Sequence, residues 1–182
     1  GAEYFLKKGF KNFAFYGFGN IVWSRERAEG FGERIQEAGY EVHYHELQES
    51  RTSDLWYYKP SALSEWLKSL PKPIALLSCD DNQGHHITEA ARHAGIRIPD
   101  EVSVLGVDND EMICDLSDPP LSSIELDVEK SGYEAARLME QMIESKTCSG
   151  PDVIVKATQV VTRHSTDIFA SKDKYIVSAL KY

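Results

Sequence analysis

Cysteine is scarce in this chain of 182 residues. The three that occur, Cys79, Cys114 and Cys148, lie far apart and form neither a CxxC pair nor an even-numbered disulfide framework. Their number and spacing exclude a disulfide-stapled scaffold and suit a reducing compartment. Because free cysteine is among the most buried residue types, we expect each of the three to be a small buried hydrophobe.

Positive charge is also in deficit. The chain has 20 lysines and arginines against 29 aspartates and glutamates, which gives a net charge of −9 with neutral histidines. A negative surface is repelled by a phosphate backbone, so these residues by themselves are not expected to bind DNA or RNA. If the protein acts on nucleic acid, another segment has to make the contact.

Long hydrophobic runs are missing as well. No stretch approaches the roughly 18 consecutive apolar residues of a membrane span, and the first residues lack the basic-then-apolar layout of a signal peptide. Hydrophobic residues make up 42% and charged residues 27% of the chain, which is typical of a globular domain and excludes general disorder. We therefore expect a soluble, cytoplasmic protein that does not contact a membrane.

Short apolar runs alternate with helical patterns along the first 110 residues. Strands are expected at residues 12–16, 40–47, 74–79 and 102–107, and helices at residues 24–38, 63–70 and 82–94, with a polar, aromatic-rich loop at 48–59. Strands that alternate with helices of this length form βαβ units. The expected fold class is therefore α/β, with a mainly parallel sheet covered by helices on both faces.

The alternation ends after Asp110. Residues 111–123 contain Pro119 and Pro120 and are expected to be irregular, whereas residues 127–145 form the most strongly patterned helix and residues 153–161 a final strand. Residues 1–9 resemble the last turns of a helix and residues 171–182 the start of another. We therefore expect the sequence to be a piece of a longer chain.

Polar residues follow several expected strands at their carboxyl ends, where ligands bind in open parallel sheets. They are Trp23 to Arg27 after the first strand, Asp80 and Asp81 after the third, and Asp108 and Asp110 after the fourth. From these we single out Arg27, Asp80 and Asp108, with Trp23 beside them. Carboxylates accept hydrogen bonds from neighbouring hydroxyls, and arginine donates several in a fixed fork. Together with an aromatic face, such a set favours a polyol ring as the ligand.

Each member of this set also has an ordinary alternative. Arg27 lies in the first turn of its helix, where the helix dipole disfavours a cation, but it can pair with Glu26 or Glu29. An aspartate at a strand end often caps the next helix, which would account for Asp80 and Asp108 without a ligand. The sequence alone leaves both interpretations open.

Catalytic and cofactor motifs are incomplete. Gly17 and Gly19 begin a dinucleotide-binding loop, but Val22 stands where its third glycine belongs. Asp108 and Asp110 are spaced like the DxD nucleophile of haloacid-dehalogenase phosphatases, but Glu111 follows where that motif has Thr or Val. The histidines lack zinc spacing, and no GxSxG is present. We expect no enzyme activity, no cofactor and no metal, with a phosphatase as a remote alternative.

Four segments together resemble the effector-binding domain of the lactose/galactose repressor family. They are NFAFYGF followed by RERAEGF, PIALLSCDD, RIPDEVSVLGVDND, and PPLSSIELDVEKSGYEAARLMEQMI. A closer resemblance is to the xylose-responsive regulators of bacteria, in which an AraC-type DNA-binding region follows the effector domain. It is carried by NFAFYG, WSRER, IPDEVSVLGVDNDE and RHSTD. The resemblance covers about residues 1–167.

The resemblance implies a type I periplasmic-binding-protein-like fold, in which sugar binds between two lobes. Residues 1–125 would form the C-terminal lobe, 126–152 a crossover and a helix of the absent N-terminal lobe, 153–170 a returning strand, and 171–182 the start of the AraC-type region. Family sugar contacts fall on Arg27, Asp80 and Asp108, although many repressors have Asn where this chain has Asp80.

The implied function is a sugar sensor for D-xylose or a related pentose in a dimeric transcription regulator whose DNA contacts lie outside this chain. A sugar-binding protein of a transporter is the alternative within the same fold.

Overall fold

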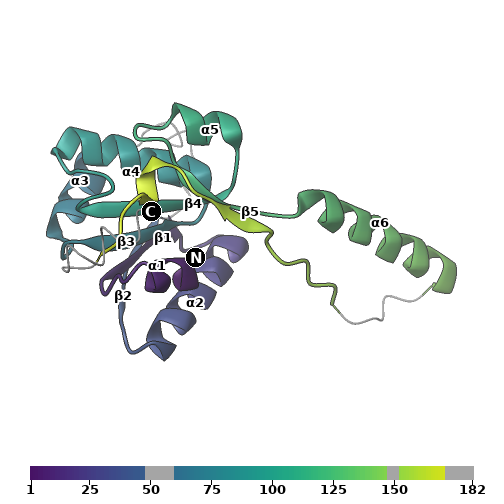
Figure 1. Cartoon of the computed structure of the whole chain (residues 1–182). Helices are drawn as coiled ribbons and strands as arrows, with labels where there is room; N and C mark the ends of the chain where they lie inside the picture. Colours follow the sequence, from purple (N-terminus) through teal and green to yellow (C-terminus); the bar gives the residue numbers. More distant parts are fainter. Residues whose placement is uncertain (48–59, 147–151, 171–182) are drawn as a thin grey trace.

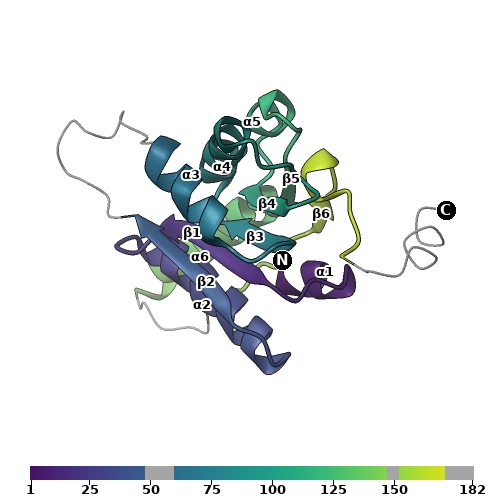
Figure 2. The same ribbon diagram turned by 90° about the vertical axis from the view of Figure 1, so that its left-hand side faces the viewer.

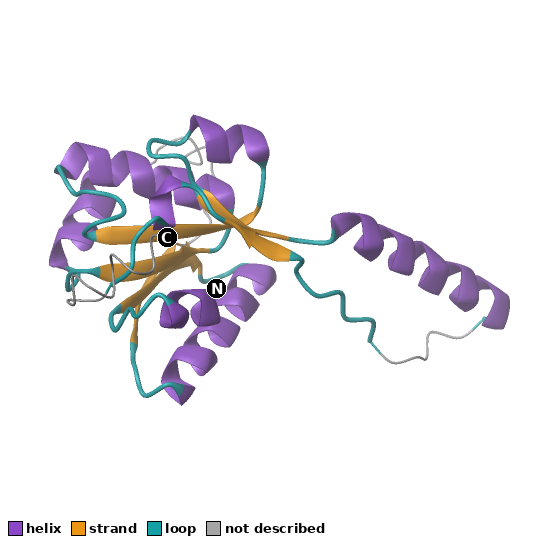
Figure 3. Ribbon diagram, viewed as in Figure 1, coloured by secondary structure: helices purple, strands orange, loops and turns teal. Residues whose placement is uncertain are grey.

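A six-stranded sheet in the order β2-β1-β3-β4-β5-β6 organises the molecule (Figure 3). The computed structural model describes residues 1–47, 60–146 and 152–170. The strands are β1 (Phe13–Phe18), β2 (Val42–Leu47), β3 (Ile74–Ser78), β4 (Val102–Asp108), β5 (Ser122–Glu125) and β6 (Gln159–Val161). The first five strands are parallel, and β6 pairs antiparallel with β5. The expected α/β fold class is confirmed.

Helices cover both faces of the sheet, as the two perpendicular views in Figures 1 and 2 show. One face carries α3 (Pro60–Ser69), α4 (Asp81–Ala94) and α5 (Glu111–Leu116), and the other carries α1 (Ala2–Lys7) and α2 (Val22–Glu37). Successive residues of a strand point to opposite faces, so Phe13 and Phe15 pack in the cluster with α2, while Ala14 and Tyr16 pack in the cluster with α3 and α4. The central strands β1, β3 and β4 are therefore buried on both faces and mostly apolar.

Helix α6 (Val128–Ser145) stands apart from this body. It projects away from the sheet beyond β5 (Figure 1), and none of its residues is buried. The chain then returns through β6 to a short 3₁₀ helix, η2 (His164–Thr166), that packs beside β4 and β5. The helix predicted at 127–145 thus forms, but its apolar side lacks a partner among the described residues.

Three sequence predictions differ from the structure. Residues 111–123, expected to be irregular, form α5 and the start of β5, because Asp110 caps the helix before the prolines are reached. The strand expected at 153–161 is limited to β6 at its carboxyl end. Its partner strand β5 ends at Glu125, whose carbonyl accepts from the Thr158 amide (2.9 Å), so the residues before Thr158 have no strand to pair with in β5. Helix α2 begins at Val22 rather than at residue 24. Ser24 does not cap the helix, because its hydroxyl accepts from the amide of Phe18, the last residue of β1 (2.8 Å).

Some expectations concern residues that the structure does not describe. The aromatic-rich loop at 48–59 and the helix start at 171–182 both lie outside the described residues, as does Cys148. Cys79 and Cys114 are buried as predicted, and burial raises the pKa of each thiol to about 12. Within the described ranges, no helix is both long and apolar enough to cross a lipid bilayer.

Candidate functional site

The three polar residues selected from the strand ends lie on neighbouring elements at one edge of the sheet. β1, β3 and β4 are adjacent and parallel, so the segments that follow them leave the sheet at the same edge. Arg27 comes from α2, which follows β1; Asp80 follows β3; and Asp108 is the last residue of β4. The topology therefore brings together residues that are more than 80 positions apart in the sequence.

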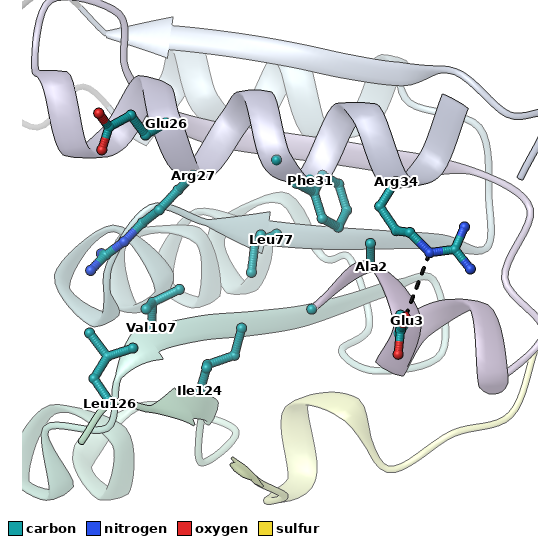
Figure 4. A pocket seen from close by; sticks show the side chains of 12 residues that line it. Ala2, Glu3, Glu26, Arg27, Phe31, Arg34, Leu77, Val107, Ile124 and Leu126 are labelled. Atoms are coloured by element: carbon teal, nitrogen blue, oxygen red, sulfur yellow. Dashed lines mark ion pairs between the residues drawn. The ribbon is translucent and has the colours of Figure 1, made fainter. Parts of the chain in front are cut away.

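Arg27 joins the group. Its Nη2 donates to Oδ1 of Asp108 (3.0 Å), and its Nη1 donates to the carbonyl of Cys79, the residue before Asp80. Figure 4 shows its side chain leaving α2 toward the strand that carries Val107. The alternative in which Arg27 pairs with Glu26 or Glu29 on its own helix is not the arrangement observed, because its ion pair is with Asp108.

Trp23 lies one helical turn before Arg27. The guanidinium carbon of Arg27 is 5.1 Å from the centre of the Trp23 ring, within the range of a cation–π contact, and the edge of Trp23 meets Phe18. The tryptophan residue is 41% exposed. A large aromatic surface thus lies beside the ion pair and is open to a ligand.

Asp108 is available for a further contact. Its side chain is 46% exposed although it pairs with Arg27, so its carboxylate retains lone pairs toward solvent. The backbone there is unusual: Asp108 has φ of 106° and Asn109 has φ of 55°, both in the left-handed region that non-glycine residues rarely occupy. Backbone strain of this kind gathers at ligand sites.

Asp80 combines two roles. It is the N-cap of α4, with its Oδ1 accepting from the Gln83 amide (2.7 Å), so the capping alternative raised from the sequence is correct as far as it goes. Burial raises the pKa of this carboxyl, and the charge of Asp108 raises it further, while the Gln83 amide and Arg27 oppose the rise. The sensitivity of Asp80 to Asp108 and Arg27 indicates that the three groups share one electrostatic environment.

A cavity of about 370 Å³ lies beside this group and overlaps it at Arg27 (Figure 4). Its walls are mostly apolar and include Phe31, Leu77, Val107 and Ile124. Its charged lining residues are Glu3, Glu26, Arg27 and Arg34, of which Glu3 and Arg34 pair with each other (3.7 Å). Of the residues selected from the strand ends, Arg27 lines it, whereas Trp23, Asp80 and Asp108 do not. We therefore place the candidate site at the sheet edge formed by Trp23, Arg27, Asp80 and Asp108, and not in the cavity.

The second aspartate of the phosphatase-like spacing is already engaged. The Asp110 carboxylate accepts from the amides of Met112 (3.0 Å) and Ile113 (3.3 Å) as the N-cap of α5. A general acid in that position would need to be free to transfer a proton. Within the described ranges, no group of three or more potential metal ligands gathers anywhere.

Sequence reasoning placed Asp81 at this strand end but assigned no role to it or to the other residues directly behind the site. Asp81 is buried and accepts from Ser123, Asn109 donates to Glu125 (3.3 Å), and Arg163 donates to Asn109 (3.0 Å). Burial raises the pKa of Asp81, and the hydrogen bonds from Ser123 and the Asp110 amide oppose that rise. The only sequence signal was a second aspartate after Asp80, because the partners lie on segments distant in the chain.

The profile of the periplasmic binding protein-like domain matches residues 2–166. The chain belongs to this family. Among the relatives of this periplasmic binding protein-like chain is the xylose operon regulatory protein of Haemophilus influenzae, 31% identical over 97% of the chain and 46% of the relative. The protein of the same name from Escherichia coli K12 is 29% identical over 97% and 45%.

Solved structures of the family agree. A xylose-binding transcription activator superposes with a TM-score of 0.81 at 27% identity, over 99% of this chain and 48% of that one. A complex of the transcriptional regulator CelR with cellobiose superposes with a TM-score of 0.71 at 25% identity, over 90% and 49%. This periplasmic binding protein-like chain spans about half the length of the curated relatives it matches. These relatives are transcription regulators rather than enzymes, so the phosphatase alternative is not supported.

Proposed function

We propose that this chain is the sugar-sensing part of a bacterial transcription regulator and that its ligand is D-xylose or a related pentose. One observation carries the proposal: the Arg27–Asp108 pair, with Asp80 close by and an exposed Trp23, lies at the ligand edge of a parallel sheet. The similarity to two xylose operon regulatory proteins supports the pentose as the class of sugar.

The arrangement fits a small polyol chemically. Arg27 has donors beyond those used by Asp108 and Cys79, and the exposed Asp108 carboxylate has free acceptor positions for ring hydroxyls. Asp80 supplies a second carboxylate, and Trp23 supplies an apolar surface for the C–H face of the ring. An acceptor-rich site of this kind selects a ligand that donates hydrogen bonds in several directions.

The proposed sensor has two lobes, of which residues 1–125 form one. Residues 126–152 cross to the second lobe and deliver α6 to it, residues 153–170 return, and residues 171–182 lead into an AraC-type DNA-binding region. Two observations support this division: the chain spans about half of its relatives, and α6 leaves the lobe with an uncovered apolar side. The complete regulator would act in the cytoplasm as a homodimer that contacts DNA through the region outside this chain.

Sugar would act by closing the two lobes. A ligand that contacts both lobes binds the closed form more tightly than the open form, and the difference in affinity is the most by which it can shift the balance. The net charge of −9 agrees with a division of labour in which this part senses sugar and another part meets the phosphate backbone.

A titration of the full-length protein with D-xylose tests the proposal. We expect Arg27→Ala and Asp108→Ala each to weaken binding by about 10- to 100-fold, because each removes a charge-assisted hydrogen bond to the ligand. Arg25→Ala is the matched control, since Arg25 is an exposed arginine of the same helix and its loss should leave the affinity unchanged. Calorimetry measures all four proteins. Equal affinity of the wild type and both site variants would remove these residues from the sugar site.

A further inference from the structure

Asp81 is a buried carboxylate directly behind the candidate site. It is 2% exposed, whereas its neighbour Asp80 is only partly buried. Its Oδ1 accepts from the Ser123 hydroxyl (2.5 Å) and its Oδ2 accepts from the Asp110 amide (2.7 Å). A Cβ at Gly106 would lie 2.1 Å from Oδ1 of Asp81, so only glycine at this position of β4 leaves room for the carboxylate.

Both oxygens of Asp81 hold the backbone that follows Asp108. The Asp110 amide is bound directly, and the Asn109 amide donates to the same Ser123 hydroxyl (3.1 Å) that donates to Asp81. One carboxylate therefore holds two consecutive amides, that of Asp110 directly and that of Asn109 through the Ser123 hydroxyl. These are the amides of the two residues that immediately follow the proposed sugar contact.

The backbone at this place needs such support. Asp108 and Asn109 have φ of 106° and 55°, and two consecutive non-glycine residues leave this region unless their surroundings hold them there. The direction of the Asp108 side chain depends on these angles, and with it the 3.0 Å contact to Arg27. If the Asn109 and Asp110 amides were held less firmly, the backbone angles would change, and with them the direction of the Asp108 carboxylate.

We propose that Asp81 is a positioning residue, which holds the Asp108 carboxylate in the orientation that pairs with Arg27 and receives a sugar hydroxyl. The proposal rests on the proposed function for the role of Asp108 toward sugar. The geometry that it assigns to Asp81, a clamp on the Asn109 and Asp110 amides, belongs to the protein without ligand and can be tested separately.

The first test is Asp81→Asn in the full-length protein. Asparagine is uncharged and has one acceptor oxygen where aspartate has two. Its NH₂ group has to face either the Asp110 amide, which also donates, or the Ser123 hydroxyl, which would then have to accept from it as well as from the Asn109 amide. We expect the affinity for D-xylose to fall on the order of tenfold. The matched control is Ser64→Ala, which removes another buried hydrogen bond. The Ser64 hydroxyl donates to the carbonyl of Ala90, nine residues further along α4 than Asp81, so its loss should leave the affinity unchanged.

A double-mutant cycle separates positioning from general destabilisation. If Asp81 acts through Asp108, Asp81→Asn should weaken xylose binding in the wild-type background but add nothing to Asp108→Ala. The same fold-loss in both backgrounds, or no loss in the wild type, would overturn the proposal. Wild-type protein that binds no pentose would instead count against the proposed function.

Amide hydrogen exchange gives a readout that needs no sugar. The amides of Asn109 and Asp110 should exchange at least about tenfold faster in Asp81→Asn than in wild type or Ser64→Ala, because only the first variant releases them. Unchanged exchange at these two amides would overturn the clamp even if no sugar were found to bind.

Discussion

In the proposed site, Asp80 serves both the fold and the ligand. It caps α4 through the Gln83 amide while its pKa responds to Asp108 and Arg27. Asparagine caps a helix about as well as aspartate, so exchanging the two changes the chemistry offered to a ligand with little effect on the helix. The difference is that a carboxylate only accepts hydrogen bonds, whereas an amide also donates.

Asp80→Asn should therefore change sugar preference more than stability. We expect D-xylose to bind about three- to tenfold more weakly, while sugars that offer an acceptor at this place lose less or gain, because the new NH₂ group can donate to them. The free energy of unfolding should change by less than about 0.5 kcal/mol. Calorimetric titration with a panel of pentoses and hexoses measures the preference. An equal loss for every sugar in the panel would contradict a direct role for Asp80.

At the residue scale, position along the chain predicted which residues lie at the edge of the sheet. It did not predict which buried residues hold them in place. Arg27 and Asp108 could be selected because each follows a strand that had to be buried and parallel. Asp81 could be listed at the same strand end, but its buried role could not be predicted, because which of two consecutive aspartates turns inward depends on where α4 begins and on the space left by Gly106 on another strand. A sequence does not display such pairings between distant segments.

At the scale of elements, Arg163 ties the returning chain to the site. Its Nε donates to Asp115 on α5 (2.8 Å), and its Nη1 donates to the Asn109 side chain (3.0 Å) and to the Leu121 carbonyl (3.1 Å). The side chain is only 15% exposed. One arginine thus connects the segment after β6 with α5, with the end of β4 and with the entry to β5.

Removal of this arginine should be costly. We expect Arg163→Ala to lower the free energy of unfolding by about 2–3 kcal/mol, because it leaves several partly buried acceptors without a donor. Arg137→Ala is the matched control: Arg137 pairs with Glu134 on the exposed surface of α6, and its loss should cost less than about 0.5 kcal/mol. Urea unfolding followed by circular dichroism measures both. Similar costs for the two variants would show that the Arg163 contacts are no stronger than a surface pair.

Elements with a clear apolar pattern were predicted correctly, whereas α5 and β5 were not. β1, β3 and β4 are short, mostly apolar runs, and α4 ends at Gly95 with φ of 69°. Both features can be predicted from the sequence. α5 has six residues and β5 has four, too few for a period to emerge, and Pro119 and Pro120 between them favour an irregular interpretation. Their structure comes from the Asp110 cap and from pairing with β4 and β6, which are tertiary effects.

At the scale of the whole molecule, helix α6 is unusual because its apolar side is exposed. Its sequence has the strongest apolar stripe of the chain, yet Ile143 is 70% exposed and Met139 is 61% exposed. Apolar stripes of this width normally face a core. In the proposed two-lobe protein the second lobe supplies that core, so the exposed stripe belongs to the 182-residue chain rather than to the complete regulator.

The 182-residue chain by itself should therefore associate through α6. Contiguous exposed apolar surface promotes self-association, and a second copy offers the same stripe as a partner. We expect light scattering after size exclusion to show a concentration-dependent dimer or larger species.

Met139→Glu combined with Ile143→Glu should shift the chain to monomer, because charge on the stripe opposes its burial. Gln141→Glu, which adds charge on the same helix without removing an apolar group, should leave the association unchanged. A wild-type chain that stays monomeric at all concentrations with α6 helical, or a dimer that survives the double substitution, would show that this stripe drives no association.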